Sequence, residues 1–190
     1  DSISKGMMRN AHYPENWAVF HPGASVTGGC KNTEHGLKCL SKWLGAHHWD
    51  IIILNFGLHD IGLDYEHVKL NTYVENLRNI LQGLKRYGTT VFWVSTTPVP
   101  SVPLKPPRTQ CDVYRYNQAA EQLMKTEGIK VIHLNTFVQQ LCSNASDPSW
   151  YYSECPGIQL DNNVHFTSLG YAKMAEYVVS HVDLPENSWE

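Results

Sequence analysis

The pattern of apolar and polar positions along the chain predicts buried strands separated by helices. Short apolar runs of the length typical of strands occupy residues 17–20, 50–55, 90–95 and 130–134. Helical spacing follows the second run, where apolar side chains recur mostly three or four residues apart until Gly88. The members of that stripe are Val68, Tyr73, Leu77, Ile80, Leu81 and Leu84.

Two further helices are predicted at residues 112–127, closed by Gly128, and at about residues 167–181. Strands this apolar, alternating with helices, are typical of a mostly parallel sheet with helices on both faces. We therefore expect an α/β fold, a three-layer α/β/α sandwich. We find no repeat or linker that would divide the chain, so residues 1–190 are expected to form a single domain.

Residues 97–107 follow the third predicted strand and are rich in proline, which excludes a helix interior or a central strand. This segment is predicted to be a stiff loop. Loops that leave the carboxyl ends of parallel strands are where such folds place their sites.

Composition and charge exclude several classes of function. Of the 190 residues, 42% are hydrophobic and 17% charged, and no apolar run approaches the roughly 20 residues of a membrane span. The 15 basic and 18 acidic residues are scattered, with a net charge of -3, so nucleic acid is not expected as a partner. No metal is expected either, because the adjacent His47 and His48 point different ways and the cysteines lack paired zinc-site spacing.

Five cysteines favour disulfide bonds. Cys30 with Cys39 and Cys142 with Cys155 would each close a short loop and leave Cys111 unpaired, although the sequence leaves the connectivity open. Asn144 begins an Asn-Ala-Ser glycosylation sequon in a polar stretch. Together these features favour a secreted or lumenal protein, and the abrupt start at Asp1 indicates a processed or truncated terminus.

Three short motifs gain meaning from their order. Residues 1–4 read DSIS, the second strand runs directly into FGLHD at residues 56–60, and DNNVHFT at residues 161–167 precedes the last helix. In this order and spacing the chain resembles the SGNH (GDSL-like) hydrolases, which have an Asp-Ser start, a G-x-N-D block after a strand and a D-x-x-H block before the final helix. Further similarity to one bacterial branch lies in GLK at 36–38, KWLG at 42–45, NFGLHD at 55–60 and TTPVP at 96–100.

The resemblance implies a flavodoxin-like sheet of about five strands and an esterase that needs no cofactor. Its nucleophile would be Ser2, and the base that takes the serine proton would be His165, whose near-neutral pKa range suits both acceptance and return of a proton. The family pattern places the orienting aspartate three residues before the histidine, where this chain has Asn162. Either Asp161 reaches Nδ1 of His165, which we slightly favour, or an amide or backbone carbonyl takes this role and the site is a dyad.

The developing oxyanion would need hydrogen-bond donors. The resemblance implies the backbone N–H of Ser2, a glycine N–H at Gly28 or Gly29, and the G-x-N-D asparagine, whose position holds His59. A histidine can donate one N–H there. Asp60 is expected to fasten its loop by accepting backbone N–H bonds.

The strand that precedes the Asp-Ser turn lies in the middle of the sheet in this fold, and the printed sequence has no residues for it. An empty central slot would leave two rows of buried backbone groups unpaired. We therefore expect another segment to fill it. Either the polymer continues before Asp1, or a peptide severed before Asp1 is retained as a bound partner.

Two hypotheses of different class follow. The first is a carboxylic ester hydrolase with an acyl-enzyme at Ser2, acting on small-molecule or carbohydrate esters of short acyl groups such as acetyl; transfer of the acyl group to a sugar would use the same residues. The second is a secreted binding or structural protein on the same scaffold, favoured by His59, Asn162 and the missing strand.

Overall fold

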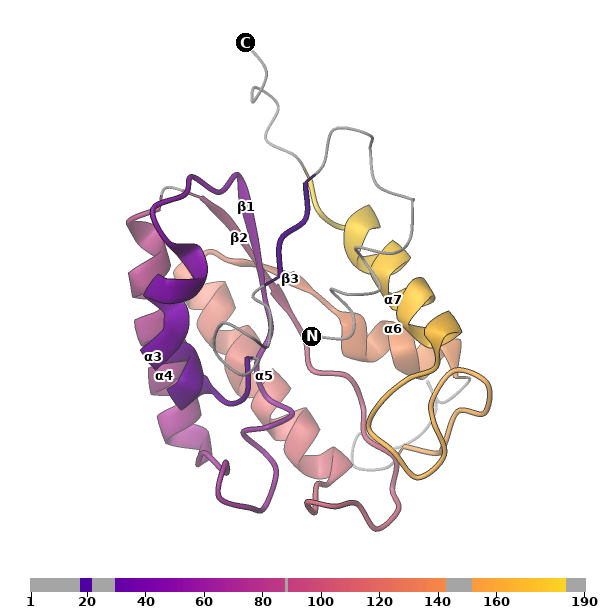
Figure 1. The fold of residues 1–190 in the computed structure, drawn as a ribbon. Coiled ribbons are helices and arrows are strands. Elements are labelled where there is room, and N and C mark those ends of the chain that lie inside the picture. Colours follow the sequence, from indigo (N-terminus) through magenta and orange to yellow (C-terminus); the bar gives the residue numbers. More distant parts are fainter. Residues whose placement is uncertain (1–17, 22–29, 88, 143–151, 184–190) are drawn as a thin grey trace.

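The computed structural model describes residues 18–21, 30–87, 89–142 and 152–183. Within these ranges the chain alternates helices and strands, as the apolar pattern predicts (Figure 1). In chain order the elements are α3 (Thr33–Leu44), β1 (Ile51–Leu54), α4 (Leu70–Lys85), β2 (Thr90–Val94), α5 (Gln110–Glu127), β3 (Lys130–Ile132), α6 (Leu134–Leu141) and α7 (Ser168–Ser180).

The strands form a parallel sheet of three in the order β1-β2-β3. Ile52 pairs with Val91 in one ladder, and Trp93 pairs with Val131 in the other. The central strand is the most deeply buried of the three, and Phe92 and Trp93 are almost fully covered. This is the pattern of a parallel strand covered on both faces.

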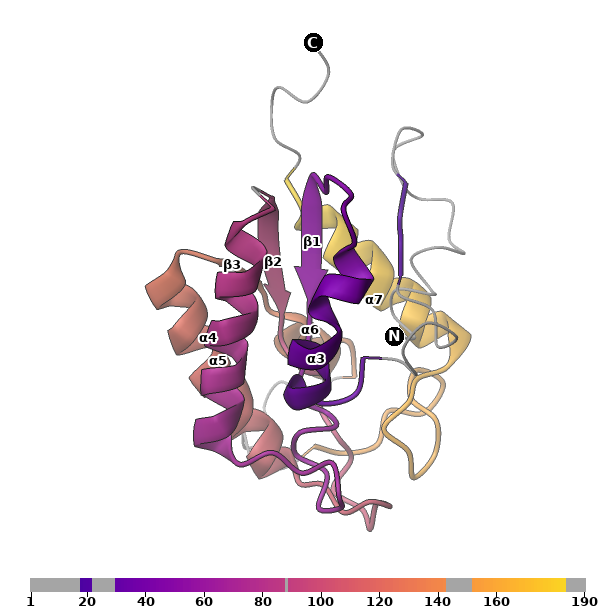
Figure 2. The same cartoon turned by 60° about the vertical axis from the view of Figure 1, so that its left-hand side comes forward.

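Helices cover both faces of the sheet, so the predicted three-layer arrangement is confirmed. In Figure 1, α3, α4 and α5 lie on one side and α6 and α7 on the other, and the turned view of Figure 2 agrees. Successive side chains of β2 point to opposite faces. Accordingly, Trp93 belongs to the core beneath α3, α4 and α5, whereas Phe92 and Val94 belong to the core beneath α6 and α7.

The ends of the predicted helices are explained by capping. Thr109 and Thr167 cap α5 and α7, each accepting a backbone N–H of the first turn through its side chain, and Gly128 ends α5 at a φ of 70°. Two helices lie where none was predicted. Asn32 caps α3, whereas α6 begins at Leu134, immediately after the short strand β3, with which that residue had been grouped.

The strand predicted at residues 17–20 is wrong as far as the structure describes it. Residue 17 lies outside the described ranges, and residues 18–20 form no strand. Phe20 is 75% exposed and contacts the ring of Trp49 edge-on. An apolar run forms a buried strand only where a neighbouring strand accepts its ladder, and within the described ranges β1 pairs only with β2. What pairs with the other edge of β1 stays a prediction.

One of the two proposed disulfides is present. Cys142 is bonded to Cys155, whereas Cys30, Cys39 and Cys111 are free thiols. Cys39 lies on α3 with its Sγ 3.5 Å from Nε2 of His35, so the proposed Cys30–Cys39 bond is not formed. In the described part of the chain no helix is both long and apolar enough to span a membrane.

Candidate functional site

The candidate site residues that the structure describes lie in loops at the carboxyl edge of the sheet. The loops after β1 and β2 and the segment before α7 all lie at the lower edge in Figure 1. Two hydrogen bonds join the first two loops. Nε of Arg108 donates to the carbonyl of Leu58 at 2.7 Å, and the N–H of Leu63 donates to the carbonyl of Pro107. Burial lowers the pKa of Arg108 from its usual value.

The turn at Gly57 brings the FGLHD loop against the loop after β2. Gly57 has a φ of 145°, and a Cβ placed on it would lie 2.3 Å from Oγ1 of Thr96. The Thr96 hydroxyl also donates to the carbonyl of Phe56, to which the buried hydroxyl of Tyr73 donates as well. Only glycine fits both this backbone conformation and this approach.

Asp60 fastens the loop to the start of α3. Its side chain is fully buried, and Oδ1 accepts the backbone N–H of Thr33 at 2.9 Å and the Thr33 hydroxyl at 2.6 Å. The bond from a backbone N–H is of the kind expected from the sequence. Burial raises the pKa of Asp60 to about 6, against the lowering effect of the Thr33 hydrogen bonds.

His59, at the position of the G-x-N-D asparagine, is paired with an acid. Its Nδ1 lies 2.5 Å from Oε2 of Glu66, and Oε1 of Glu66 lies 3.7 Å from Nζ of Lys31. The backbone carbonyl of Glu66 also accepts a hydrogen bond from Asn32. Glu66 therefore holds the His59 ring by Nδ1, and Nε2 becomes a donor when the ring carries both protons.

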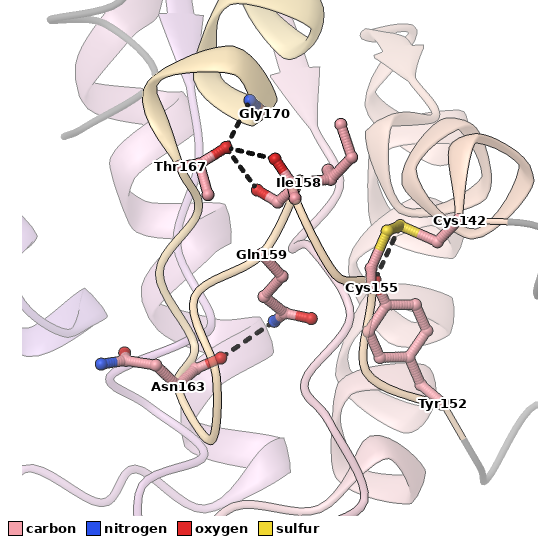
Figure 3. The surroundings of a disulfide bond; sticks show 9 residues. Cys142, Tyr152, Cys155, Ile158, Gln159, Asn163, Thr167 and Gly170 are labelled. Carbon is pink, nitrogen blue, oxygen red and sulfur yellow. Dashed lines mark hydrogen bonds between the residues drawn. A yellow bond between two sulfur atoms is a disulfide. The ribbon is translucent and has the colours of Figure 1, made fainter.

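A small hairpin carries His165. Gln159 and Phe166 form an antiparallel bridge, and Leu160 N–H donates to the carbonyl of His165 at 3.0 Å. The base of the hairpin is tied to α7, because the Thr167 hydroxyl donates to the carbonyl of Ile158 and accepts from Gly170 (Figure 3). His165 thus lies on an exposed tip whose base is held to a helix.

The side chain of Asn163 holds the imidazole of His165 in one tautomer. Its Oδ1 accepts the backbone N–H of His165 at 3.1 Å and lies 2.8 Å from Nδ1 of the same residue. A backbone N–H can only donate, so the atom facing it is the amide oxygen; an amide oxygen can only accept, so Nδ1 carries the proton. Nε2 of the neutral ring is then free of a proton and can accept one.

The other two residues of the tip are placed differently. Asn162 has a φ of 51°, a conformation that asparagine tolerates, and its backbone N–H donates to Oε1 of Glu154 at 2.7 Å. Asp161 is exposed and forms no hydrogen bond with the described residues. In this structure the amide of Asn163, rather than Asp161, contacts His165.

The disulfide lies beside the hairpin. The backbone carbonyl of Cys155 accepts the N–H groups of Ile158 and Gln159 at the start of the hairpin. Tyr152 is fully buried, and its hydroxyl donates to Sγ of Cys142 (Figure 3). Burial raises the pKa of Tyr152 well above its usual value.

Several predicted site residues lie outside the described ranges: Ser2, Gly28, Gly29 and the sequon residue Asn144. Among the residues that are described, no group of three or more His, Cys, Asp or Glu could hold a metal ion. Sequence reasoning missed Asn163, Glu66 and Gln159. Only Asn163 gave a signal, because it is a second amide within reach of His165.

Solved structures of hydrolases are similar in fold to this chain. A lipase/acylhydrolase from Enterococcus faecalis matches with a TM-score of 0.63 and 21% identity, over 80% of this chain and 72% of that one. An acetyl xylan esterase (AlAXEase) matches with a TM-score of 0.66 and 14% identity, over 82% and 78%. An acetylxylan esterase from Geobacillus stearothermophilus matches with a TM-score of 0.63 and 14% identity, over 80% and 68%.

No curated protein sequence matches the chain significantly. The family model of the GDSL-like lipases and acylhydrolases, in contrast, matches residues 1–173. That range contains all three motifs in the expected order. The fold, the loops at the carboxyl edge of the sheet and this match agree, and the chain belongs to the GDSL-like lipase/acylhydrolase family.

Proposed function

We propose that this protein is a serine esterase in which His165 is the general base and Ser2 the nucleophile. The observation that carries the proposal is the contact of Asn163 Oδ1 with Nδ1 of His165. It leaves Nε2 unprotonated on an exposed hairpin tip, and Nε2 has no partner among the described residues. An imidazole in this state can take the serine proton and later return it to the leaving group.

In this proposal Asn163 replaces a carboxylate as the orienting group, and Asp161 does not contact His165. An amide fixes the tautomer and the ring plane, but it stabilises the imidazolium less than a carboxylate does. The site is therefore a Ser-His dyad supported by an amide, one of the two arrangements that the sequence left open. Family membership supports the reaction class.

The oxyanion formed in each step would be bound by the backbone N–H of Ser2, the N–H of Gly28 or Gly29, and Nε2 of His59. The contact of Glu66 with Nδ1 supports the last assignment, because it fixes the plane of the His59 ring and leaves Nε2 outside this contact. A ring that carries both protons can donate from Nδ1 to Glu66 and from Nε2 to the oxyanion. The fastening of Asp60 to Thr33 keeps the His59 backbone against α3.

The substrate is proposed to be an ester of a short acyl group, such as an acetylated carbohydrate. Two of the structural neighbours are named as acetylxylan esterases. Their identity to this chain is low, so they support this choice only by analogy of fold. We also propose a secreted or lumenal location with glycan on Asn144, supported by the Cys142–Cys155 disulfide, since such bonds persist in oxidising compartments.

Hydrolysis of p-nitrophenyl acetate tests the function. The wild type should release p-nitrophenol with a burst, and Ser2→Ala should reduce the rate to background because no acyl-enzyme can form. Equal rates for the two proteins would refute the proposal. Ser4→Ala is the matched control, since it removes a hydroxyl from the same segment.

A binding protein on the same scaffold is the second candidate. It is favoured by the histidine in the place of the oxyanion asparagine and by the absence of a carboxylate contact to His165 among the described residues. A fluorophosphonate probe separates the two candidates, because only a working acyl-enzyme site reacts covalently at Ser2. A folded protein that takes up no probe would favour the binding protein.

A further inference from the structure

Gln159 is a buried polar residue for which the proposed reaction gives no role. Only 3% of its surface is exposed. Its Nε2 donates to the backbone carbonyl of Asn163 at 3.0 Å, whereas its Oε1 is buried and has no partner in the described part of the chain (Figure 3). A buried polar atom without a partner is unfavourable, because it loses its hydrogen bonds with water and gains none in the fold.

Packing alone does not explain a glutamine at this place. Its backbone pairs with that of Phe166, and Phe166 and Ile158 belong to the core beneath α6 and α7. Methionine has nearly the same volume and would fill the space without leaving Oε1 unsatisfied. The property that methionine lacks is the amide N–H that holds the Asn163 carbonyl.

This hydrogen bond holds Asn163, the residue whose side chain contacts the ring of His165 and fixes its tautomer. The backbone of Asn163 is held by Gln159, and the side chain of Asn163 binds both the backbone N–H and Nδ1 of His165. The neighbouring contact of the tip, between Glu154 and the Asn162 N–H, is in contrast exposed to solvent. Gln159 therefore connects the buried base of the hairpin with its exposed tip.

We propose that Gln159 is a positioning residue, which fixes Asn163 and thereby keeps His165 in the tautomer that is protonated on Nδ1. The proposal rests on the role proposed above for His165. It makes a prediction about the free protein as well as about the reaction. Without the Gln159 amide the backbone of Asn163 is no longer held, and its Oδ1 moves away from Nδ1 of His165. The ring can then carry its proton on Nε2, and an Nε2 that is already protonated cannot act as a base.

The test compares wild type with Gln159→Met in two measurements. The ¹⁵N shifts of the His165 ring report the tautomer in the free protein, and p-nitrophenyl acetate reports kcat and KM. In Gln159→Met we expect a mixture of tautomers and a kcat lower by about tenfold, with KM changed less than twofold, because the base and not the substrate is displaced. Gln122→Met, on the exposed face of α5, is the matched control.

The measurements separate this proposal from the proposed function. An unchanged tautomer and a kcat within twofold of wild type in Gln159→Met would overturn the role of Gln159, even if Ser2→Ala is inactive. If the wild type hydrolyses no ester, the ring shifts still decide whether Gln159 controls His165. Gln159→Asn, whose shorter amide cannot reach Asn163, gives the same readout should the methionine variant fail to fold.

Discussion

At the scale of single residues, the partner of His165 is neutral, and this limits how well the imidazolium is stabilised. Asn163→Asp keeps an oxygen beside the His165 N–H and Nδ1 and adds a negative charge. We expect kcat on p-nitrophenyl acetate to rise by about tenfold, and Asn163→Ala to lower it by at least as much. Asn79→Asp, on an exposed turn of α4, controls for the added charge. A larger loss with Asp161→Ala than with Asn163→Ala would instead assign the orienting role to Asp161.

Asp60 predicts a dependence of stability on pH. Its pKa is raised from 3.8 to about 6, so the folded protein keeps a proton that the unfolded chain releases. The stability from this group is present below pH 3.8 and is lost as pH rises to about 6, on the order of 3 kcal/mol. Urea unfolding from about pH 3.5 to about pH 7 should show this loss in wild type and not in Asp60→Asn. Parallel profiles for the two proteins would contradict it.

The residues that sequence reasoning found and missed differ in how they act. His59 and His165 were found because their side chains occupy motif positions next to a strand and a helix. Glu66 and Gln159 act through contacts that depend on the path of a loop, and no periodicity records that path. The choice between Asp161 and an amide or backbone carbonyl was open for the same reason, because the turn at Asn162 decides which group faces Nδ1 of His165.

At the scale of elements, β2 and the three longest helices were predicted from the sequence, whereas the shorter α3 and α6 were missed although each has a clear apolar face. β2 buries an almost continuous run of apolar side chains, and α4 buries apolar side chains at regular helical spacing. α3 contains Gly36, against which Phe56 packs, so one position of its buried face is not apolar in the sequence. Residues 18–20 show the opposite error, because apolar residues alone do not supply a strand partner.

Gly170, where α7 contacts the hairpin, is expected not to tolerate a larger residue. A Cβ on Gly170 would lie 2.3 Å from the backbone carbonyl oxygen of Ile158, which already accepts the N–H and hydroxyl of Thr167. We expect Gly170→Ala to lower the free energy of unfolding by at least about 2 kcal/mol and to displace the hairpin. Gly128→Ala is the comparison, because a Cβ at this position has no atom within 4 Å and the only cost is the backbone strain of an alanine at a φ of 70°. Equal losses would show that the close approach is not rigid.

At the scale of the whole molecule, the two cores on either side of the sheet are stabilised differently. The core beneath α3, α4 and α5 is filled largely by apolar side chains of these helices and of the sheet. The core beneath α6 and α7 is smaller, and it includes Tyr152, Cys155 and Phe166 from the irregular segment that leads into the hairpin. A segment without regular elements loses much chain entropy on folding. The Cys142–Cys155 disulfide offsets part of that loss.

We therefore expect that reduction of this one disulfide lowers the free energy of unfolding. The disulfide spans a sequence separation of 13 residues. A loop of this size contributes about 3 kcal/mol by restricting the unfolded chain. A reductant should therefore lower the urea midpoint of wild type and of Cys111→Ser, whose exposed thiol takes no part, but not that of Cys142→Ala/Cys155→Ala, which should already unfold at the lower midpoint. If the double variant were as stable as the oxidised wild type, the core beneath α6 and α7 would be held by its apolar contacts alone.

Reduction should also affect the His165 hairpin, because the first N–H groups of the hairpin donate to the carbonyl of Cys155. A reductant should therefore lower kcat before the sheet unfolds.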